Sequence, residues 1–195
     1  MSRKAAIERK TRETQIRVAI DLDGSGESKI DTGIGFFDHM LTHLAKHSLC
    51  DIEVACKGDL QVDAHHTVED VGIALGQAIE RAVADKSGIV RYGCAAAPMD
   101  EALVLTALDI SGRGSLSYGL DLKKEMIGAF DCELTPEFFK AVAVNAGINV
   151  HIRQLDGRNA HHVVEAAFKS FARALREAVS IDERITGVPS TKGTL

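Results

Sequence analysis

Two copies of a His-His-x-x-Glu pattern are the residues in this chain whose types and spacing indicate chemistry. The copies lie at His65, His66 and Glu69 and at His161, His162 and Glu165. Residues four apart on a helix share one face, so the first His and the Glu of each copy can reach one ion. Consecutive helical residues diverge by about 100°, so the second His of each copy faces a different ion. The pattern therefore predicts two metal sites, each with ligands from more than one segment.

The donor types narrow the choice of metal. Mixed imidazole and carboxylate ligation suits Mn, Fe, Zn or Co, and the lack of thiolates argues against a soft cysteine site. A single His pair at a helix start is more often a solvated cap, but two copies in matched positions favour metal binding. His39 and His43 lie one helical turn apart and are either ligands or surface residues, whereas His151 in an apolar strand is expected to be structural.

Scattered cations form a second candidate group. Arg91, Arg113 and Lys169 lie in three separate segments, and Lys192 lies in a small Gly-flanked loop with Ser190. Each alone is expected to be a surface charge, but together they can hold a phosphate through charge-assisted hydrogen bonds. The SGRGS segment at 111–115 lacks the spacing of a phosphate-binding P-loop.

Hydrophobic periodicity predicts the elements that position these residues. Strands are expected at 13–22, 101–113, 114–122 and 148–155, and helices at 36–48, 67–84, 133–147 and 161–179. A hairpin is expected over 51–63, where apolar residues alternate around Lys57 and Gly58. Residues 88–100 are expected to be loop and turn.

The chain repeats itself. The helix beginning at 65 matches the helix beginning at 161, and FFDHMLTHLAKHSLCDIEV aligns with LTPEFFKAVAVNAGINVHI, which pairs His39 with Glu137. We therefore expect an α+β fold of two similar halves, 1–90 and 91–195, each a strand–helix–strand–helix unit. No Pro- or Ser-rich linker separates them, so the halves are expected to share one compact body.

Composition excludes several classes of protein. The chain has 195 residues and a formal net charge of −5, which argues against nucleic-acid binding. No apolar run approaches the roughly 18 residues that cross a bilayer, so no membrane contact is expected. The charged N-terminal segment lacks a secretory signal, and the four Cys show no CxxC spacing. A reduced, cytoplasmic protein is the expectation.

Several segments together resemble the imidazoleglycerol-phosphate dehydratase family of histidine biosynthesis. They are DAHHTVEDVGIALG, GFFDHMLTHLAKHS, MDEALVLTALDISGR, GRNAHHVVEAAFKSFARALR and VPSTKGTL, and the resemblance covers nearly the whole chain. It implies two similar halves, each a four-stranded sheet backed by two helices. It also implies a homo-oligomer of 24 subunits, with two Mn²⁺ per active site and ligands from neighbouring subunits.

The resemblance also assigns roles to residues. It implies metal ligands at His39, His65, His66, Glu69, Glu137, His161, His162 and Glu165. It implies substrate contacts from Glu13, His47, Arg91, Arg113, Lys169, Ser190, Thr191 and Lys192, joined by His39, His65, Glu69 and His161. Catalytic roles fall to Glu13, Glu69 and Glu165. Many members carry His where this chain has Glu137, but a carboxylate oxygen also suits Mn²⁺.

The implied reaction dehydrates D-erythro-imidazole glycerol phosphate to imidazole acetol phosphate. The proton that is lost has no adjacent carbonyl, so metal ions on the imidazole nitrogens would be needed to stabilise an imidazolate that expels the hydroxyl. Glu13 is the candidate acid–base group. Two alternatives stay open at this point: a two-metal phosphatase or other hydrolase, which would release free phosphate, and a non-enzymatic oligomer whose metals are structural.

Overall fold

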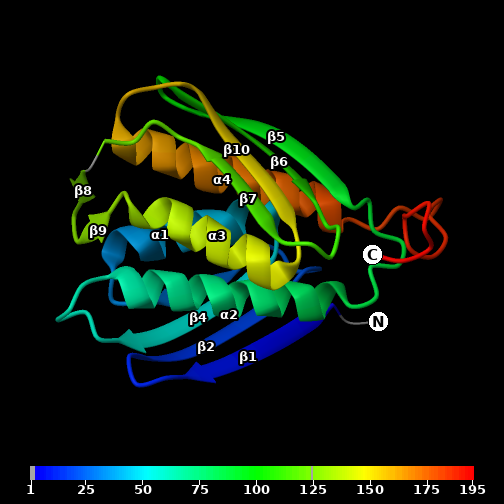
Figure 1. Cartoon of the computed structure of the whole chain (residues 1–195), viewed down its shortest axis with the longest axis horizontal. Helices are drawn as coiled ribbons and strands as arrows, with labels where there is room; N and C mark the ends of the chain where they lie inside the picture. Colours follow the sequence, from blue (N-terminus) through cyan, green and yellow to red (C-terminus); the bar gives the residue numbers. More distant parts are fainter. Residues whose placement is uncertain (1–2, 124) are drawn as a thin grey trace.

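Two four-stranded sheets enclose a layer of helices in the computed structural model, which describes residues 3–123 and 125–195 (Figure 1). The first sheet contains β1 (Lys4–Lys10), β2 (Thr14–Asp21), β3 (Ser28–Asp31) and β4 (Asp51–Gly58). The second contains β5 (Tyr92–Met99), β6 (Ala102–Asp109), β7 (Ser115–Gly119) and β10 (Asn149–Asp156). The helices of the described residues are α1 (Gly35–Ser48), α2 (His65–Val83), α3 (Leu134–Ala146) and α4 (Ala160–Val179). A two-stranded hairpin, β8 (Met126–Ile127) and β9 (Phe130–Asp131), precedes α3.

The two large sheets have the same topology. Their strand orders are β1-β2-β4-β3 and β5-β6-β10-β7. In each sheet the first three strands pair antiparallel and the last pair, β3 with β4 or β7 with β10, is parallel. The α+β class with two similar halves, each a four-stranded sheet with two helices, is therefore confirmed. A division of the chain between residues 90 and 91 stays a prediction.

The helix pairs with the most extensive contact join the two halves. Helix α2 packs on α3, and α1 packs on α4. The α2–α3 contact is close, because a Cβ built on Gly76 would lie 2.8 Å from the Val142 carbonyl oxygen. Aromatic rings fill the middle of the layer, where Phe138 stacks on Phe168 with ring centroids 5.1 Å apart. Because α1 packs on α4 and α2 packs on α3, predicted ligands from different halves of the chain lie close together.

The expected hairpin over 51–63 is wrong. Strand β4 ends at Gly58, and the chain then turns directly into α2. A Cβ at Gly58 would lie 2.1 Å from the Thr67 hydroxyl oxygen, so the end of the strand lies hard against the start of the helix. Leu60 and Val62, whose alternation suggested a second strand, are exposed.

The structure also differs from expectation at two edge strands. Residues 92–99, expected as loop, form β5, and the charged segment 4–10, for which no element was expected, forms β1. Each lies at the edge of its sheet and pairs with one neighbour. Pro98 is compatible with β5 because an edge strand can lack a donor. Across the described residues, no helix has both the length and the apolar character needed to cross a bilayer.

Candidate functional site

The carboxylate of Glu165 is the centre of one cluster of predicted ligands. Its side chain is only 5% exposed, and its oxygens lie 3.3 Å from His39 Nε2, 3.4 Å from His43 Nε2 and 3.4 Å from His161 Nε2. His39 and His43 come from α1, whereas His161 and Glu165 come from α4. The ring of Phe36 packs edge-on against His161 at 4.9 Å between centroids, which holds that imidazole in place. The α1–α4 contact therefore builds this cluster.

A lysine neutralises the same carboxylate. Lys169 Nζ lies 2.5 Å from Glu165 Oε1, one helical turn along α4. Burial opposes ionisation of Glu165, but the hydrogen bond from Lys169 and the nearby imidazoles outweigh it and lower the pKa of Glu165 to about 2. For His43 the effect of burial on the pKa is the opposite: burial disfavours the charged imidazolium and is the main cause that lowers the pKa of His43 to about 4. At neutral pH the cluster thus presents an ionised carboxylate beside a neutral imidazole.

The first His-His-x-x-Glu copy forms a second, more open cluster at the start of α2. His65 Nε2 lies 3.9 Å from Glu69 Oε2, and both side chains are 45% exposed. His65 also lines a cavity of about 640 Å³ together with Glu137 of α3, so the structure places these two predicted ligands around one space. The exposed Met126 of β8 and Leu60 lie at the same cavity.

The second His of each copy points away from its neighbour and is held by a carboxylate. His66 Nδ1 lies 3.1 Å from Asp59 Oδ2, and His162 Nδ1 lies 2.7 Å from Glu101 Oε2. A carboxylate only accepts, so the proton sits on Nδ1, and the neutral form of each ring has its Nε2 lone pair available to bind a metal. These hydrogen bonds raise the pKa of both imidazoles, and the bond to His162 lowers that of Glu101 to about 2. Carboxylates hold metal-ligating imidazoles in the same way.

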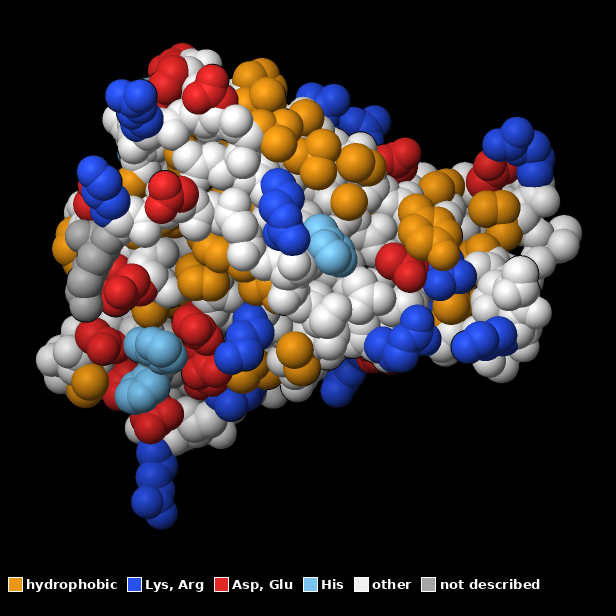
Figure 2. All heavy atoms as spheres, turned by 45° about the horizontal axis from the view of Figure 1, so that its top comes forward, with side chains coloured by type: hydrophobic (Ala, Val, Ile, Leu, Met, Phe, Trp, Pro, Cys, Tyr) orange, Lys and Arg blue, Asp and Glu red, His pale blue; other side chains and the backbone are white. Residues whose placement is uncertain are grey.

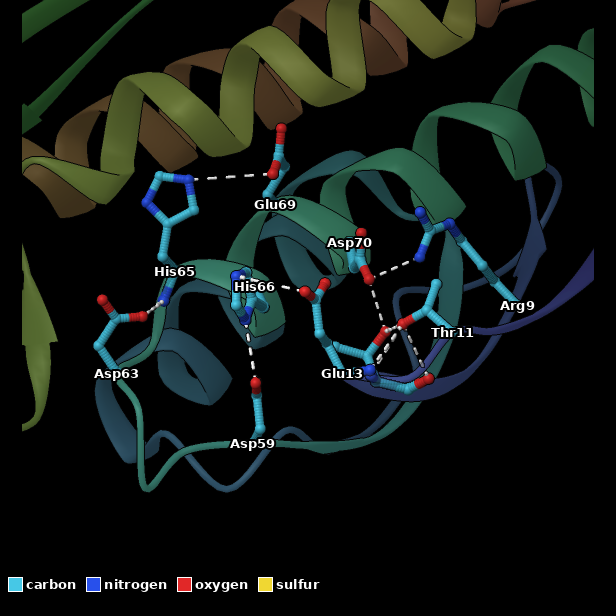
Figure 3. Close-up of polar contacts among 10 residues, drawn as sticks. Arg9, Thr11, Glu13, Asp59, Asp63, His65, His66, Glu69 and Asp70 are labelled. Carbon is cyan, nitrogen blue, oxygen red and sulfur yellow. Dashed lines mark hydrogen bonds and ion pairs between the residues drawn. The ribbon is translucent and has the colours of Figure 1, made fainter.

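Glu13 lies beside the cluster at the start of α2 (Figure 3). Its Oε1 is 3.8 Å from His66 Nε2, on the turn between β1 and β2. The next residue, Thr14, donates a hydrogen bond to buried Asp70 of α2 at 2.5 Å, and Arg9 of β1 pairs with the same carboxylate at 2.5 Å. This buried network fixes the β1–β2 turn against the helix that carries His66.

Three of the four predicted phosphate-binding cations meet at the far end of the molecule. A cavity of about 580 Å³ is lined by Arg91, Tyr92, Arg113, Pro189, Ser190, Thr191, Lys192, Thr194 and Leu195. Arg91 has a positive φ of 75°, and its guanidinium is held by Asp109 at 2.7 Å and by the Pro189 carbonyl at 2.8 Å. A strained backbone fixed by such contacts is typical of a functional position.

Lys169 and His47 lie outside this cavity. Lys169 is bound to Glu165, and His47 lines a separate cavity of about 500 Å³ with Arg173 and Arg176. In Figure 2 histidines lie among carboxylates at one end of this face, whereas basic side chains are spread along its whole length. One chain does not bring all the predicted substrate contacts together.

Sequence reasoning missed three residues of the site. His43 was left as either a partner or a surface residue, and the structure places it in the Glu165 cluster. Asp59 and Glu101, which hold the two outer imidazoles, were not identified. Their spacing in the sequence carries no signal, because each reaches its His only through the fold.

The residues present fit a divalent transition metal. The structure groups His39, His43 and Glu165 as three donors within 4.8 Å of one another. Neutral imidazole and carboxylate are the ligand types that Mn, Fe, Zn and Co share. Outside this cluster, Asp59 and Glu101 hold two further predicted ligands, His66 and His162, in the way that carboxylates support metal-binding imidazoles.

Fold and site together define an α+β enzyme with an imidazole–carboxylate cluster that can hold a metal ion. Residues 32–175 match the imidazoleglycerol-phosphate dehydratase family. Dehydratases of this name from Desulforamulus reducens and Acetivibrio thermocellus are 57% and 58% identical over the whole of both chains. The crystal structure of the Staphylococcus aureus enzyme has a TM-score of 0.83 and 41% identity, covering 92% of this chain and 99% of that one. The Pyrococcus furiosus enzyme, in complex with (S)-C348, has a TM-score of 0.82 and 39% identity, covering 97% of this chain and all of that one.

The chain therefore belongs to the imidazoleglycerol-phosphate dehydratase family. It is a hydro-lyase of histidine biosynthesis, as its resemblance implied. This conclusion favours dehydration over the hydrolase alternative, and an enzymatic role over purely structural metals.

Proposed function

We propose that this enzyme dehydrates D-erythro-imidazole glycerol phosphate to imidazole acetol phosphate with two Mn²⁺ per active site. The observation that carries the proposal is the pair of imidazole–carboxylate clusters on matched helices. The predicted ligands are His39, His65, His66, Glu69, Glu137, His161, His162 and Glu165. The bound ions would supply Lewis-acid polarisation of the substrate's imidazole.

The chain's own residues would bind and orient the other end of the substrate. Arg91 is already fixed by Asp109, and its position beside the Ser190–Lys192 loop suits a phosphate. Arg113 and Lys192 add charge to the same cavity. Fixing the phosphate here would orient the glycerol carbons relative to the acid–base group.

Glu13 is our candidate to move the proton, with Glu69 and Glu165 as further catalytic carboxylates. Its carboxylate is exposed and lies near His66 Nε2, so it can reach a molecule bound beside that imidazole. Glu13→Gln keeps the shape but loses the proton-accepting charge, and we expect turnover to fall about 10²–10⁴-fold. Metal content should not change.

The test measures the product formed from imidazole glycerol phosphate by wild type, Glu13→Gln and the matched surface variant Glu8→Gln of β1. A phosphorylated ketone is the expected product, and free phosphate would refute the dehydration chemistry. Glu8→Gln should behave as wild type. Turnover of Glu13→Gln within about twofold of wild type would remove Glu13 from the proton transfer.

We also propose that the active site is completed by neighbouring subunits in a homo-24-mer. Along α4, Ala178, whose carbonyl accepts from Arg91 N–H, lies ~26 Å from His161 at the helical rise of 1.5 Å per residue. A small phosphorylated imidazole cannot span that distance, so its phosphate and metal contacts would come from different copies.

We also propose that the enzyme is cytoplasmic. The four cysteines of the chain are free, which suits the reducing cytoplasm.

Light scattering tests the coupling between metal and assembly. Because ligands from different copies would share ions, verified removal of metal should reduce the particle from about 24 subunits to smaller oligomers, and Mn²⁺ should restore it. An unchanged particle mass after elemental analysis confirms metal loss would contradict this coupling.

A further inference from the structure

We propose that His43 is a metal ligand, and that His39, His43 and Glu165 form a three-ligand site within one chain, so that the two metal sites bind with unequal affinity. The inference rests on the proposed metal chemistry and extends it to a residue outside the predicted ligand set. The ligand would be a divalent first-row transition metal ion.

The spacing of the donor atoms suits a shared ion. His39 Nε2 and His43 Nε2 lie 3.2 Å apart, and each lies 3.3–3.4 Å from an oxygen of Glu165. Two ligands bound to one ion at ~2.1 Å and 90–110° apart would lie roughly 3.0–3.4 Å from each other. The three groups thus already stand at the separations that coordination requires.

Burial also favours binding at this cluster. The His43 and Glu165 side chains are 21% and 5% exposed, so both donors are held by packing between α1 and α4. Glu165 is the most buried carboxylate of the predicted ligand set, and a metal ion bound there would share its oxygens with Lys169 Nζ. Donors that are held in position before binding lose less freedom when the ion arrives.

The internal repeat offers no equivalent of His43 in the other half. The aligned position on α3 is Ala141, which is buried against α2. A Cβ at Gly72 would lie 2.9 Å from the Ala141 Cβ, so the close α2–α3 contact leaves no room for an imidazole there. His43 is therefore a feature of only one of the two sites.

The other site is more open within the chain. His65 Nε2 and Glu69 Oε2 are 3.9 Å apart, both side chains are nearly half exposed, and Glu137 faces them across a cavity of about 640 Å³. Among the described residues, His39, His43 and Glu165 are the one group of three potential ligands whose donor atoms lie within 4.8 Å of one another, and His65 and Glu69 have no such third donor. We infer that this site binds more weakly until other ligands complete it.

The experiment is a metal titration of the full-length enzyme after chelation. Co²⁺ serves as the probe, because its visible absorption reports the ligands around it, and a chelating dye measures affinity in competition. Wild type, His43→Ala, His43→Gln and the control His151→Ala are compared. His151, which the sequence suggested to be structural, is an exposed residue of β10, a strand that carries none of the predicted ligands. Circular dichroism checks that each variant is folded.

We expect two classes of site in wild type and in His151→Ala. In both His43 variants, the Co²⁺ affinity of the tighter class should fall at least roughly 10–100-fold. Loss of a residue that only supports a ligand already costs that much. The Co²⁺ spectrum of that class should change, while the weaker class should not.

An unchanged tight class in the folded His43 variants would overturn the inference, as would equal weakening of both classes or a single class in wild type. Product analysis of wild type is run separately. Release of free phosphate there would overturn the proposed function while leaving the metal result standing.

Discussion

Replacing Lys169 with Met tests whether its ammonium group balances the charge of Glu165 when no metal ion is bound. Lys169 Nζ donates to Glu165 Oε1 at 2.5 Å, and the two side chains are 18% and 5% exposed. Met keeps most of the length of the side chain and its packing on the helix, but removes the charge. Glu165 would then be a buried carboxylate without its strongest partner whenever metal is absent.

The structure sets the size of the expected effect. Removing one partner of a buried ion pair costs about 3–5 kcal/mol, and the lower end applies because Lys169 keeps some solvent contact. With metal bound, the ion supplies the missing positive charge, and only the hydrogen bond is lost, about 1 kcal/mol. The difference, about 2 kcal/mol, raises the apparent metal affinity of the variant roughly 30-fold, because metal binds the folded state.

Urea unfolding, followed by circular dichroism with a chelator and again with saturating Mn²⁺, measures both losses. We expect a large fall in the free energy of unfolding for the chelated variant and a small one for the loaded variant. The matched control is Lys4→Met, which breaks the exposed Lys4–Asp21 pair on the first sheet and should respond equally under both conditions. Equal losses for Lys169→Met with and without metal would refute the reasoning.

The same variant has a predictable pH dependence without metal. The pKa of Glu165 is about 2 in the folded wild type and near 4.5 when unfolded, so its ionisation stabilises the fold above pH 4.5. That stability is lost as pH falls from about 4.5 towards 2. Losing the hydrogen bond that lowers this pKa should move the acid loss of stability of Lys169→Met to higher pH.

Two further predictions concern the ends of the site. Arg113→Ala removes a phosphate contact worth about 1.5–3 kcal/mol and should weaken substrate binding measured by calorimetry by 10-fold or more, with an unchanged urea midpoint; normal binding would place Arg113 outside the phosphate site. Glu101→Gln leaves His162 Nδ1 without its carboxylate and should lower metal affinity about 10–100-fold in the folded enzyme, whereas unchanged affinity would show that Glu101 does not support a ligand.

Periodicity was enough to predict the helices, because each buries an apolar stripe that recurs along the sequence. It failed at the edge strands. In β1 the side chain of Ile7 alone is fully buried, and β5 is rich in Ala with a Pro near its end, so neither shows a strong alternation. Their pairing with β2 and β6 depends on backbone hydrogen bonds that leave no mark in side-chain type.

The donors of the candidate site could be identified from the sequence, but not their grouping. Spacing places His161 and Glu165 on one face of a helix, which the structure confirms at 3.4 Å. The sequence does not say that α1 packs on α4 of the opposite half and so delivers His39 and His43 to Glu165. The carboxylates on His66 and His162 were missed for the same reason, since tertiary packing alone brings them into contact.

The helix that packs against each motif explains why two copies of one motif become two different sites. On α2, Gly72 lies so close to Ala141 of α3 that a larger side chain would not fit there, and Glu137 of α3 faces His65 across a cavity. On α4, Phe168 stands at the position that corresponds to Gly72 and packs on Phe138 of α3, while α1 brings His39 and His43 to Glu165. Lys169, the next residue of α4, adds a positive charge beside the same carboxylate. The residues on the helix packed against each motif, rather than the shared motif, therefore set the donors of each site.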